Sequence, residues 1–550
     1  MFRNIAFALV ITLAFGQLPL EAQNKTVLSG FVKNAAGEPV EGALVRVRNT
    51  DLGLTFMVVS QAQGRYSTPS LPAGKYTIEG IGGEYQSNPS EKTDVVLNVA
   101  RKATPPRKRR TQADYAATLP DGPAKQLILT KCVACHDLDG VDSRTLRVLT
   151  GRQEWEEDMG LHKYYMEDRP DHLSDEEVKL LVDYMTKNFS LESKGIPRRE
   201  ERAPADPNGH FSRAFLKGPD AKYVAVEFNL RPNAAPHDIS VDSQGIAWIS
   251  EHGENEHTES GVKGGVGLIG RIDPKTFAYT HVTPPPGKLP SRMSGAAVDP
   301  QGVVWSVDNS HNARMVSYNP KTAEFKTYDL PAPPRQQEFD EAGWGDGSAN
   351  INTIAFQDGF VWGSGLLSGQ IYKLDPVSGG VITYPIPKGR PPYGLAFDNN
   401  KMLWYSAEFA DEIVKLDPAN AKRTYYKVLT RHADLRHIQT DADGNVWASA
   451  QQTDKLIKVD GRTGQVTEYA PPTPLSGVDS VDVDRKHNLI WIGEGQADRL
   501  ARFDPRTKTF VEFQLPSRGS SVKRIAVDPA NPNRVWWCGA NQAGYVEVIE

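Results

Sequence analysis

Short runs of alternating apolar and polar residues, separated by turn signals, make up most of the chain and predict β-strands. Three such runs, at 29–32, 43–47 and 75–78, lie between residues 24 and about 98. Alternation with a period of two gives each strand one face for a core and one for solvent. We therefore predict a β-sandwich at residues 24–100.

The pattern changes to a helical one between Leu119 and Ser190. Ser174 is followed by three acidic residues, which is typical of a helix N-cap and first turn. The residues after it place apolar side chains at helical spacing. We predict a small α-helical domain at 118–192, between a basic linker at 101–117 and a second linker at 193–220.

The remaining chain, 221–550, is a repeat. Seven tryptophans recur 42 to 57 residues apart, at Trp248, Trp305, Trp362, Trp404, Trp447, Trp491 and Trp536. Four strand-like runs per repeat predict a seven-bladed β-propeller. The last repeat is one strand short, and Val226–Leu230 nearly copies the outer strand at Val511–Leu515. We expect this upstream strand to complete the last blade, so the fold class is multidomain and mainly β.

Residues 1–23 have the features of a secretory signal peptide: an early Arg3, an apolar stretch and small residues near a cleavage site. No later segment is apolar for long enough to span a membrane, so we expect an exported or periplasmic protein without a transmembrane segment after cleavage. A net charge of −5 gives no reason to expect nucleic acid as a partner.

The helical region contains Cys132-Val133-Ala134-Cys135-His136. Two thiols three residues apart, followed by histidine, form the attachment motif of covalent haem c, in which His136 is the proximal iron ligand. The third cysteine, Cys538, lies far from the motif and is expected to be buried in a strand. A zinc or redox-active cysteine pair is the alternative interpretation of the motif, and the adjacent histidine disfavours it.

This region resembles class I cytochrome c domains over about 70 residues. In that family a methionine in a loop before the final helix is the sixth iron ligand. The resemblance assigns this role to Met166, with Met159 and His162 as competitors, and it implies an electron-transfer partner protein.

Residues 24–100 resemble the carboxypeptidase regulatory-like domain, through Gly37-Glu38-Pro39-Val40-Glu41-Gly42-Ala43, Gly64-Arg65-Tyr66 and Leu71-Pro72-Ala73-Gly74-Lys75-Tyr76. In that family the module carries no catalytic residues. We expect a separate domain that acts as a spacer or docking element.

The propeller resembles the streptogramin B (virginiamycin B) lyases, through the blade pattern His-x-Ile-x-Val-Asp…Gly-x-x-Trp. Those enzymes use a histidine base and two glutamates that bind magnesium. The resemblance assigns the base to His237 and one magnesium ligand to Glu251. Ala235 stands where the other glutamate is expected, which argues against magnesium binding and lyase activity.

An insertion follows Glu251 in the first blade. The distance from the blade tryptophan to the Asp or Asn that ends the following strand is 25 residues here, against 13 or 14 in blades two to six. Imidazoles and carboxylates gathered in one loop are suited to binding a divalent ion or to acid–base chemistry. The candidate divalent site comprises His237, Glu251, His252, Glu254 and His257, and a solvated polar loop is the alternative.

Three functions are compatible with these features. The first is an exported c-type cytochrome in which haem electron transfer is coupled to a propeller that binds a small-molecule or peptide substrate, or a protein partner. The second is a lyase similar to the streptogramin B enzymes, with magnesium as a candidate cofactor. The third is a non-catalytic binding protein. Fold alone does not choose between them, because propellers serve all three.

Overall fold

The computed structural model describes residues 26–102, 116–117, 119–132, 151–166, 172–190, 208–252, 267–282, 293–308, 314–331, 351–366 and 368–549. The predicted signal peptide lies outside these residues, as does most of the basic linker. No helix in the described part is long and apolar enough to cross a membrane.

The largest part of the structure is a β-propeller. Six sheets of four antiparallel strands follow one another along the chain. They are β10–β13 (Pro236–Val241, Ala247–Glu251, Leu268–Asp273, Ala278–Val282), β14–β17 (Met293–Val298, Val304–Asp308, Arg314–Asn319, Glu324–Asp329), β18–β21 (Ile351–Gln357, Phe360–Gly365, Gln370–Leu374, Val381–Pro385), β22–β25 (Pro392–Phe397, Leu403–Ala407, Glu412–Leu416, Arg423–Lys427), β26–β29 (Leu435–Thr440, Val446–Ala450, Lys455–Val459, Val466–Tyr469) and β30–β33 (Val478–Asp484, Leu489–Glu494, Arg499–Asp504, Thr509–Gln514).

A seventh sheet closes the ring. It contains β34 (Val522–Val527), β35 (Arg534–Gly539), β36 (Gln542–Val548) and the upstream strand β9 (Tyr223–Asn229). β9 pairs antiparallel with β36, with Val226 opposite Tyr545. The first strands of neighbouring sheets contact one another in a complete cycle, from β10 round to β34 and back to β10. The repeat and the closure predicted from the sequence are thus both observed.

The repeated tryptophan lies on the second strand of each blade and is buried. In four blades its indole N–H donates to an aspartate near the end of the preceding strand, as from Trp404 to Asp398 at 2.9 Å and from Trp447 to Asp441 at 2.8 Å. The same aspartate caps the tight turn between the two strands through backbone N–H groups. One carboxylate therefore fixes both the turn and the core aromatic residue, which explains the spacing of Asp and Trp in the repeat.

The N-terminal domain is a β-sandwich. One sheet contains β1 (Ser29–Asn34), β4 (Arg65–Ser67) and β7 (Val95–Leu97). The other contains β2 (Leu44–Asn49), β3 (Leu54–Val59), β5 (Thr77–Gly82), β6 (Tyr85–Gln86) and β8 (Val99–Ala100), and the short 3-10 helix η1 spans Ala62–Gly64.

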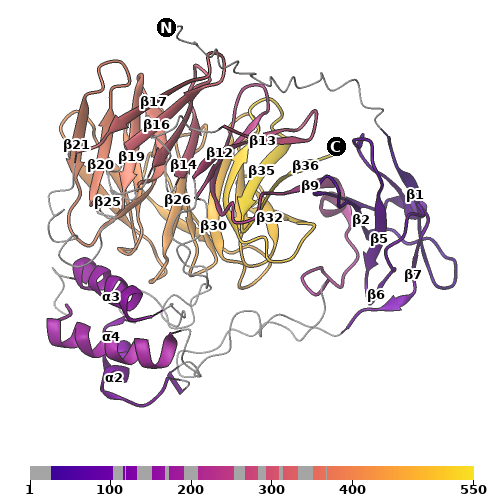
Figure 1. Ribbon diagram of the computed structural model, residues 1–550, viewed down its shortest axis with the longest axis horizontal. Helices are drawn as coiled ribbons and strands as arrows, with labels where there is room; N and C mark the ends of the chain where they lie inside the picture. Colours follow the sequence, from indigo (N-terminus) through magenta and orange to yellow (C-terminus); the bar gives the residue numbers. More distant parts are fainter. Residues whose placement is uncertain are drawn as a thin grey trace, which may run out of the picture.

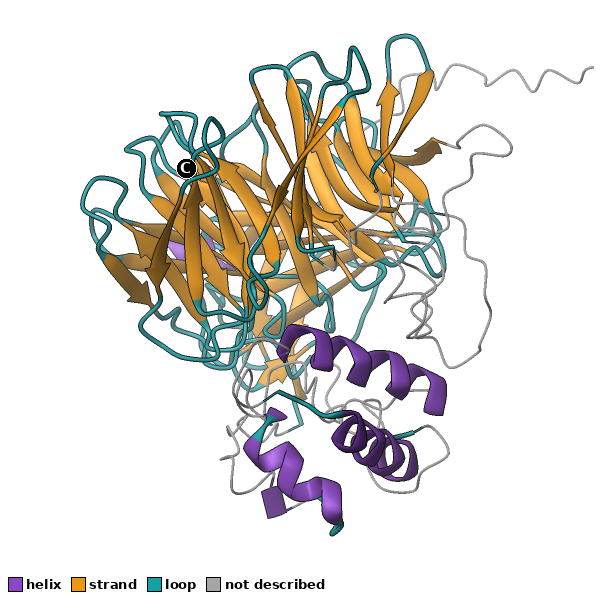
Figure 2. Ribbon diagram, turned by 90° about the vertical axis from the view of Figure 1, so that its left-hand side faces the viewer, coloured by secondary structure: helices purple, strands orange, loops and turns teal. Residues whose placement is uncertain are grey.

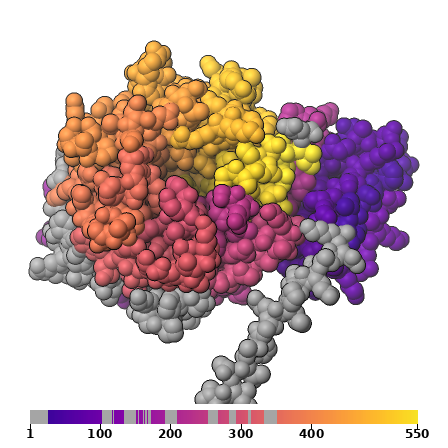
Figure 3. Space-filling view, turned by 90° about the horizontal axis from the view of Figure 1, so that it is seen from above, coloured from indigo at the N-terminus to yellow at the C-terminus, as the bar shows by residue number. Residues whose placement is uncertain are grey.

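The sandwich is joined to the propeller through a shared sheet, which the prediction of a spacer or docking domain did not include. β3 pairs antiparallel with β9, with Phe56 opposite Val226, so one sheet of nine strands runs from blade seven through the sandwich. Figure 3 shows the indigo sandwich packed beside the place where the magenta and yellow ends of the propeller meet. β9 would otherwise leave a row of unpaired backbone groups at the edge of the closing blade, and β3 pairs with that edge.

Side chains of both domains share one core. Phe56 of the sandwich, Phe228 of the closing strand and Trp536 of blade seven belong to the same buried cluster. Polar contacts also join the end of the sandwich to the segment before β9, because the Arg101 side chain donates hydrogen bonds to the carbonyl oxygens of Asn208 and Phe211. The sandwich and the propeller are therefore a single packed unit.

The helical region forms its own small body from α2 (Pro123–Thr130), α3 (Arg152–Met166) and α4 (Asp175–Phe189). These helices lie together beyond the strand ends of the propeller (Figures 1 and 2). The predicted N-cap is confirmed, since Ser174 and Glu177 form a reciprocal capping box at the start of α4. The 3-10 helix η5 (Gly218–Ala221) leads from the second linker into β9.

Candidate functional site

The first strand of every blade contains a β-bulge at the same end of the propeller. In blade one Pro236 pairs with Glu251 and Asp238 with Ser250, so His237 is the extra residue. In blade seven the same shift makes Lys523 the extra residue, and in blade six it is Asp479. Bulges redirect side chains and are common beside active sites. Here they place His237, Lys523 and Asp479 at one end of the ring of first strands, which surrounds the central channel of the propeller.

His237 is hydrogen bonded to the neighbouring carboxylate, with 2.8 Å between Nδ1 and Oδ2 of Asp238. Asp238 is buried and also accepts from the backbone N–H of Gly295 in blade two, while Arg524 Nε of blade seven lies 3.4 Å away. Asp238 thus connects three blades and orients the imidazole. A histidine held by a carboxylate at one nitrogen can exchange a proton at the other.

His252, the residue after β11, stacks on His237 with ring centroids 4.5 Å apart. The structure therefore brings together two members of the candidate divalent site, His237 and His252, whereas the Glu251 carboxylate is bound by other residues. The other two, Glu254 and His257, lie outside the described residues.

Glu251 is fully buried and already surrounded by donors. Arg231 Nε donates to Oε2 at 2.6 Å, the Tyr279 hydroxyl donates to Oε1, and His281 Nε2 lies 3.2 Å from the same oxygen. Burial and the Glu251 charge raise the pKa of Tyr279. No sequence motif identifies Arg231, Tyr279 and His281 as partners of Glu251, because they come from different segments of the chain.

These contacts do not fit the expected magnesium site. A hard cation needs several free oxygen ligands, and both Glu251 oxygens are occupied by Arg231, Tyr279 and His281. Ala235 offers no carboxylate, and its backbone is engaged with Asn541 and His252. Among the described residues, no three His, Cys, Asp or Glu side chains are grouped so as to hold a metal ion.

A second histidine, His437 of blade five, also reaches the channel. It is buried, and its ring packs edge-on against Tyr393. Burial, followed by the charges of Arg524 and His237, lowers the pKa of His437 well below its usual value. These surroundings favour the uncharged imidazole of His437.

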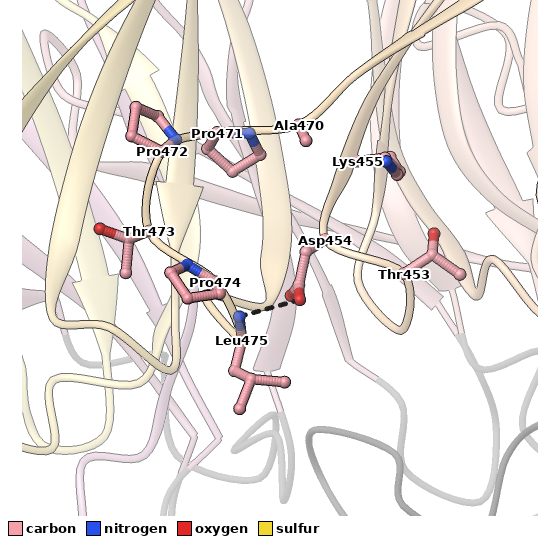
Figure 4. Close-up of a pocket in the computed structure, with 9 residues that line it drawn as sticks. All are labelled: Thr453, Asp454, Lys455, Ala470, Pro471, Pro472, Thr473, Pro474 and Leu475. Carbon is pink, nitrogen blue, oxygen red and sulfur yellow. Dashed lines mark hydrogen bonds between the residues drawn. The ribbon is translucent and has the colours of Figure 1, made fainter. Parts of the chain in front are cut away.

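Blade six has another buried acid at the position of Glu251. Glu494 ends β31, and burial, followed by the nearby Glu512, raises its pKa well above the usual range. Close by, a pocket of about 340 Å³ opens between blades five and six. Figure 4 shows its lining: Thr453, Asp454, Lys455, Ala470, Pro471, Pro472, Thr473, Pro474 and Leu475.

The pocket wall is held by hydrogen bonds within the protein. The Asp454 carboxylate accepts from the backbone N–H of Leu475 at 3.0 Å and of Gly477 at 2.8 Å. Asp411 and Asp498 hold the corresponding loops of the neighbouring blades in the same way. The carboxylate of Asp454 is therefore a repeated structural feature of the fold.

In the helical body, Cys132 follows α2 and packs against the core, while Cys135 and His136 lie outside the described residues. Met166 and Met159 are both buried in this core. Met166 is the last residue of α3, although the sequence analysis expected it in a loop. His162 Nδ1 lies 2.7 Å from the carbonyl oxygen of Asp158 one turn earlier.

Comparison with known proteins agrees with the two β-domains. Residues 335–550 match the virginiamycin B lyase family, and residues 27–104 match the carboxypeptidase regulatory-like domain. A streptogramin B lyase structure has a TM-score of 0.51 at 20% identity, covering 60% of this chain and 100% of its own. The virginiamycin B lyase from Staphylococcus aureus gives 0.49 at 19% identity, covering 59% and 98%. No curated protein sequence matches the chain.

The chain thus combines a virginiamycin B lyase-like β-propeller with an N-terminal carboxypeptidase regulatory-like domain. At this level of identity the structural similarity shows the fold alone.

Proposed function

We propose that the protein is an exported c-type cytochrome whose propeller binds a substrate or a protein partner and whose haem exchanges electrons with it. The observation that carries the proposal is the Cys-x-x-Cys-His sequence directly after α2, with Cys132 against a helical core that contains three methionines. The signal-like residues 1–23 support export.

The helical body has side chains suited to haem. Cys132 and Cys135 would attach it, and His136 and Met166 are the proposed axial ligands, with Met159 as the competitor. The indole N–H of Trp155 is buried and has no acceptor among the described residues, so it is suited to a polar group of a bound cofactor. When bound, haem with histidine and methionine ligands supplies one-electron transfer.

Spectroscopy of the purified protein tests this proposal. We expect reversible haem absorption changes on reduction and reoxidation, and a change in redox state when the physiological substrate or partner is added. A protein that is folded and exported but shows no haem absorption would contradict the proposal.

A lyase is the second candidate, and the His237–Asp238 pair is the observation that favours it. Because Arg231, Tyr279 and His281 occupy both oxygens of Glu251, the structure argues against a lyase that depends on magnesium. We expect streptogramin ring opening to be absent or independent of magnesium, and Ala235→Glu to confer no magnesium dependence, because Glu251 remains bound to Arg231. Turnover by the wild type that requires magnesium would instead support the lyase.

A further inference from the structure

Lys523 is the bulge residue of blade seven, the counterpart of His237 in the adjacent blade one. The first strands of these two blades, β34 and β10, contact each other. Lys523 therefore lies at the same end of the propeller as His237, on the neighbouring first strand.

The other charges of this region are largely compensated within the protein. Arg231 pairs with Glu251, and Arg524 lies against Asp238. In blade five, Arg436 lies 3.1 Å from Asp434 and 3.5 Å from Glu408. Lys523 is partly buried, yet it forms no ion pair with any described residue.

A partly buried ammonium group without a counter-ion is costly unless a ligand supplies the negative charge. Burial lowers the pKa of His437 and favours its uncharged form, so this imidazole does not compete with Lys523 for an anion. A magnesium ion at Glu251 would not hold the anion instead, because Arg231, Tyr279 and His281 occupy the Glu251 oxygens.

We propose that the channel mouth binds a carboxylate-bearing ligand without a divalent metal, with Lys523 as the anion-binding residue and His237 as the adjacent hydrogen-bonding group. The inference rests on the proposed role of the propeller in binding a substrate or partner, and it names the class of that ligand. The step is binding alone, and no covalent bond forms or breaks. Lys523 meets the carboxylate, while Asp238 holds Nδ1 of His237 so that Nε2 can contact the ligand.

Calorimetric titration of the full-length holoprotein tests the proposal, after treatment with EDTA and again with added magnesium chloride. The probes are succinate, trialanine and trialanine amide, which separate a small-molecule acid from a peptide carboxyl terminus. The variants are Lys523→Gln and Lys523→Arg. Lys486→Gln removes the same charge from an exposed turn between β30 and β31, at the opposite end of the propeller, and is the matched control.

We expect succinate or trialanine to bind the EDTA-treated protein. If trialanine binds better than succinate, trialanine amide should bind at least about tenfold more weakly than trialanine, because it lacks the carboxylate. Lys523→Gln should weaken binding by about tenfold or more, whereas Lys523→Arg and Lys486→Gln should retain it. Absence of binding, a requirement for magnesium, or normal binding by Lys523→Gln would overturn the inference. The haem spectrum, recorded on the same samples, reports the proposed cytochrome function independently of these outcomes.

Discussion

At the scale of single residues, Glu251 shows how far a side chain's role depends on neighbours that the sequence does not place beside it. The spacing to His237 suggested a metal ligand, whereas the structure has the carboxylate bound by Arg231, Tyr279 and His281. We expect Glu251→Gln to lower the free energy of unfolding by roughly 1–3 kcal/mol, because Arg231 loses its counter-ion. Chemical denaturation measures this loss.

Asp308 provides the matched control for Glu251. It ends the second strand of blade two, is fully buried and pairs with Arg314 at 2.8 Å. Asp308→Asn should cost a similar amount, and neither variant should change magnesium affinity. A loss of magnesium binding that is specific to Glu251→Gln would show that the carboxylate is a metal ligand.

Glu227 on β9 predicts a pH dependence of stability. Burial raises its pKa to about 7 from an ordinary 4.5, so it is more protonated in the folded than in the unfolded chain between these values. Unfolding then releases protons, and the free energy of unfolding falls by up to about 3 kcal/mol as the pH rises through this window.

Glu227→Gln keeps an uncharged acceptor for Ser517 and removes the titration. The variant should match the wild type near pH 4 and exceed its stability above pH 7, as measured by denaturation at several pH values. A stability difference that does not change with pH would refute this account of Glu227.

Met166 and Met159 offer a direct comparison of candidate iron ligands, since both are buried in the same core. We expect Met166→Ala to remove the weak sulfur–iron absorption near ~700 nm that accompanies histidine–methionine ligation, and Met159→Ala to retain it. Loss of the band in Met159→Ala alone would reassign the ligand.

At the scale of elements, the pairing of β3 with β9 makes the stability of the propeller depend on the sandwich. Removal of residues 26–100 should expose the edge of β9 and the side chains of Val226 and Phe228, and so lower the melting temperature of the propeller. Calorimetry of the full chain should show the sandwich and the propeller unfolding together. Two separate transitions, or an unchanged melting temperature after the deletion, would contradict the shared sheet.

The repeat itself was predictable, because each blade carries its own alternating strands and its own Asp–Trp pair. The copy of an outer strand at Val226–Leu230 was enough to predict how the ring closes. The junction was not predictable, since β3 and β9 are each ordinary strands and nothing in their sequences identifies the partner. Local patterns specify elements, whereas pairing between distant edges depends on which edges remain uncovered in three dimensions.

At the scale of the whole molecule, the chain combines two packed units: the sandwich with the propeller, and the helical body. The sequence singled out His237 and His252 as candidate site residues, and the structure stacks their rings together. It gave no reason to single out Lys523, whose strand β34 lies beside β10 of blade one only because the ring closes. Such contributions come from closure of the fold and have no sequence spacing.

The central claim is that this molecule carries covalent haem on Cys132 and Cys135. Intact-mass spectrometry of the exported protein, before and after acid–acetone extraction, tests it most directly. We predict a mass greater than that of the processed chain by one haem, unchanged by extraction and absent from the double variant Cys132→Ala, Cys135→Ala. A wild-type mass equal to the processed chain alone, or haem removed by extraction, would contradict the account.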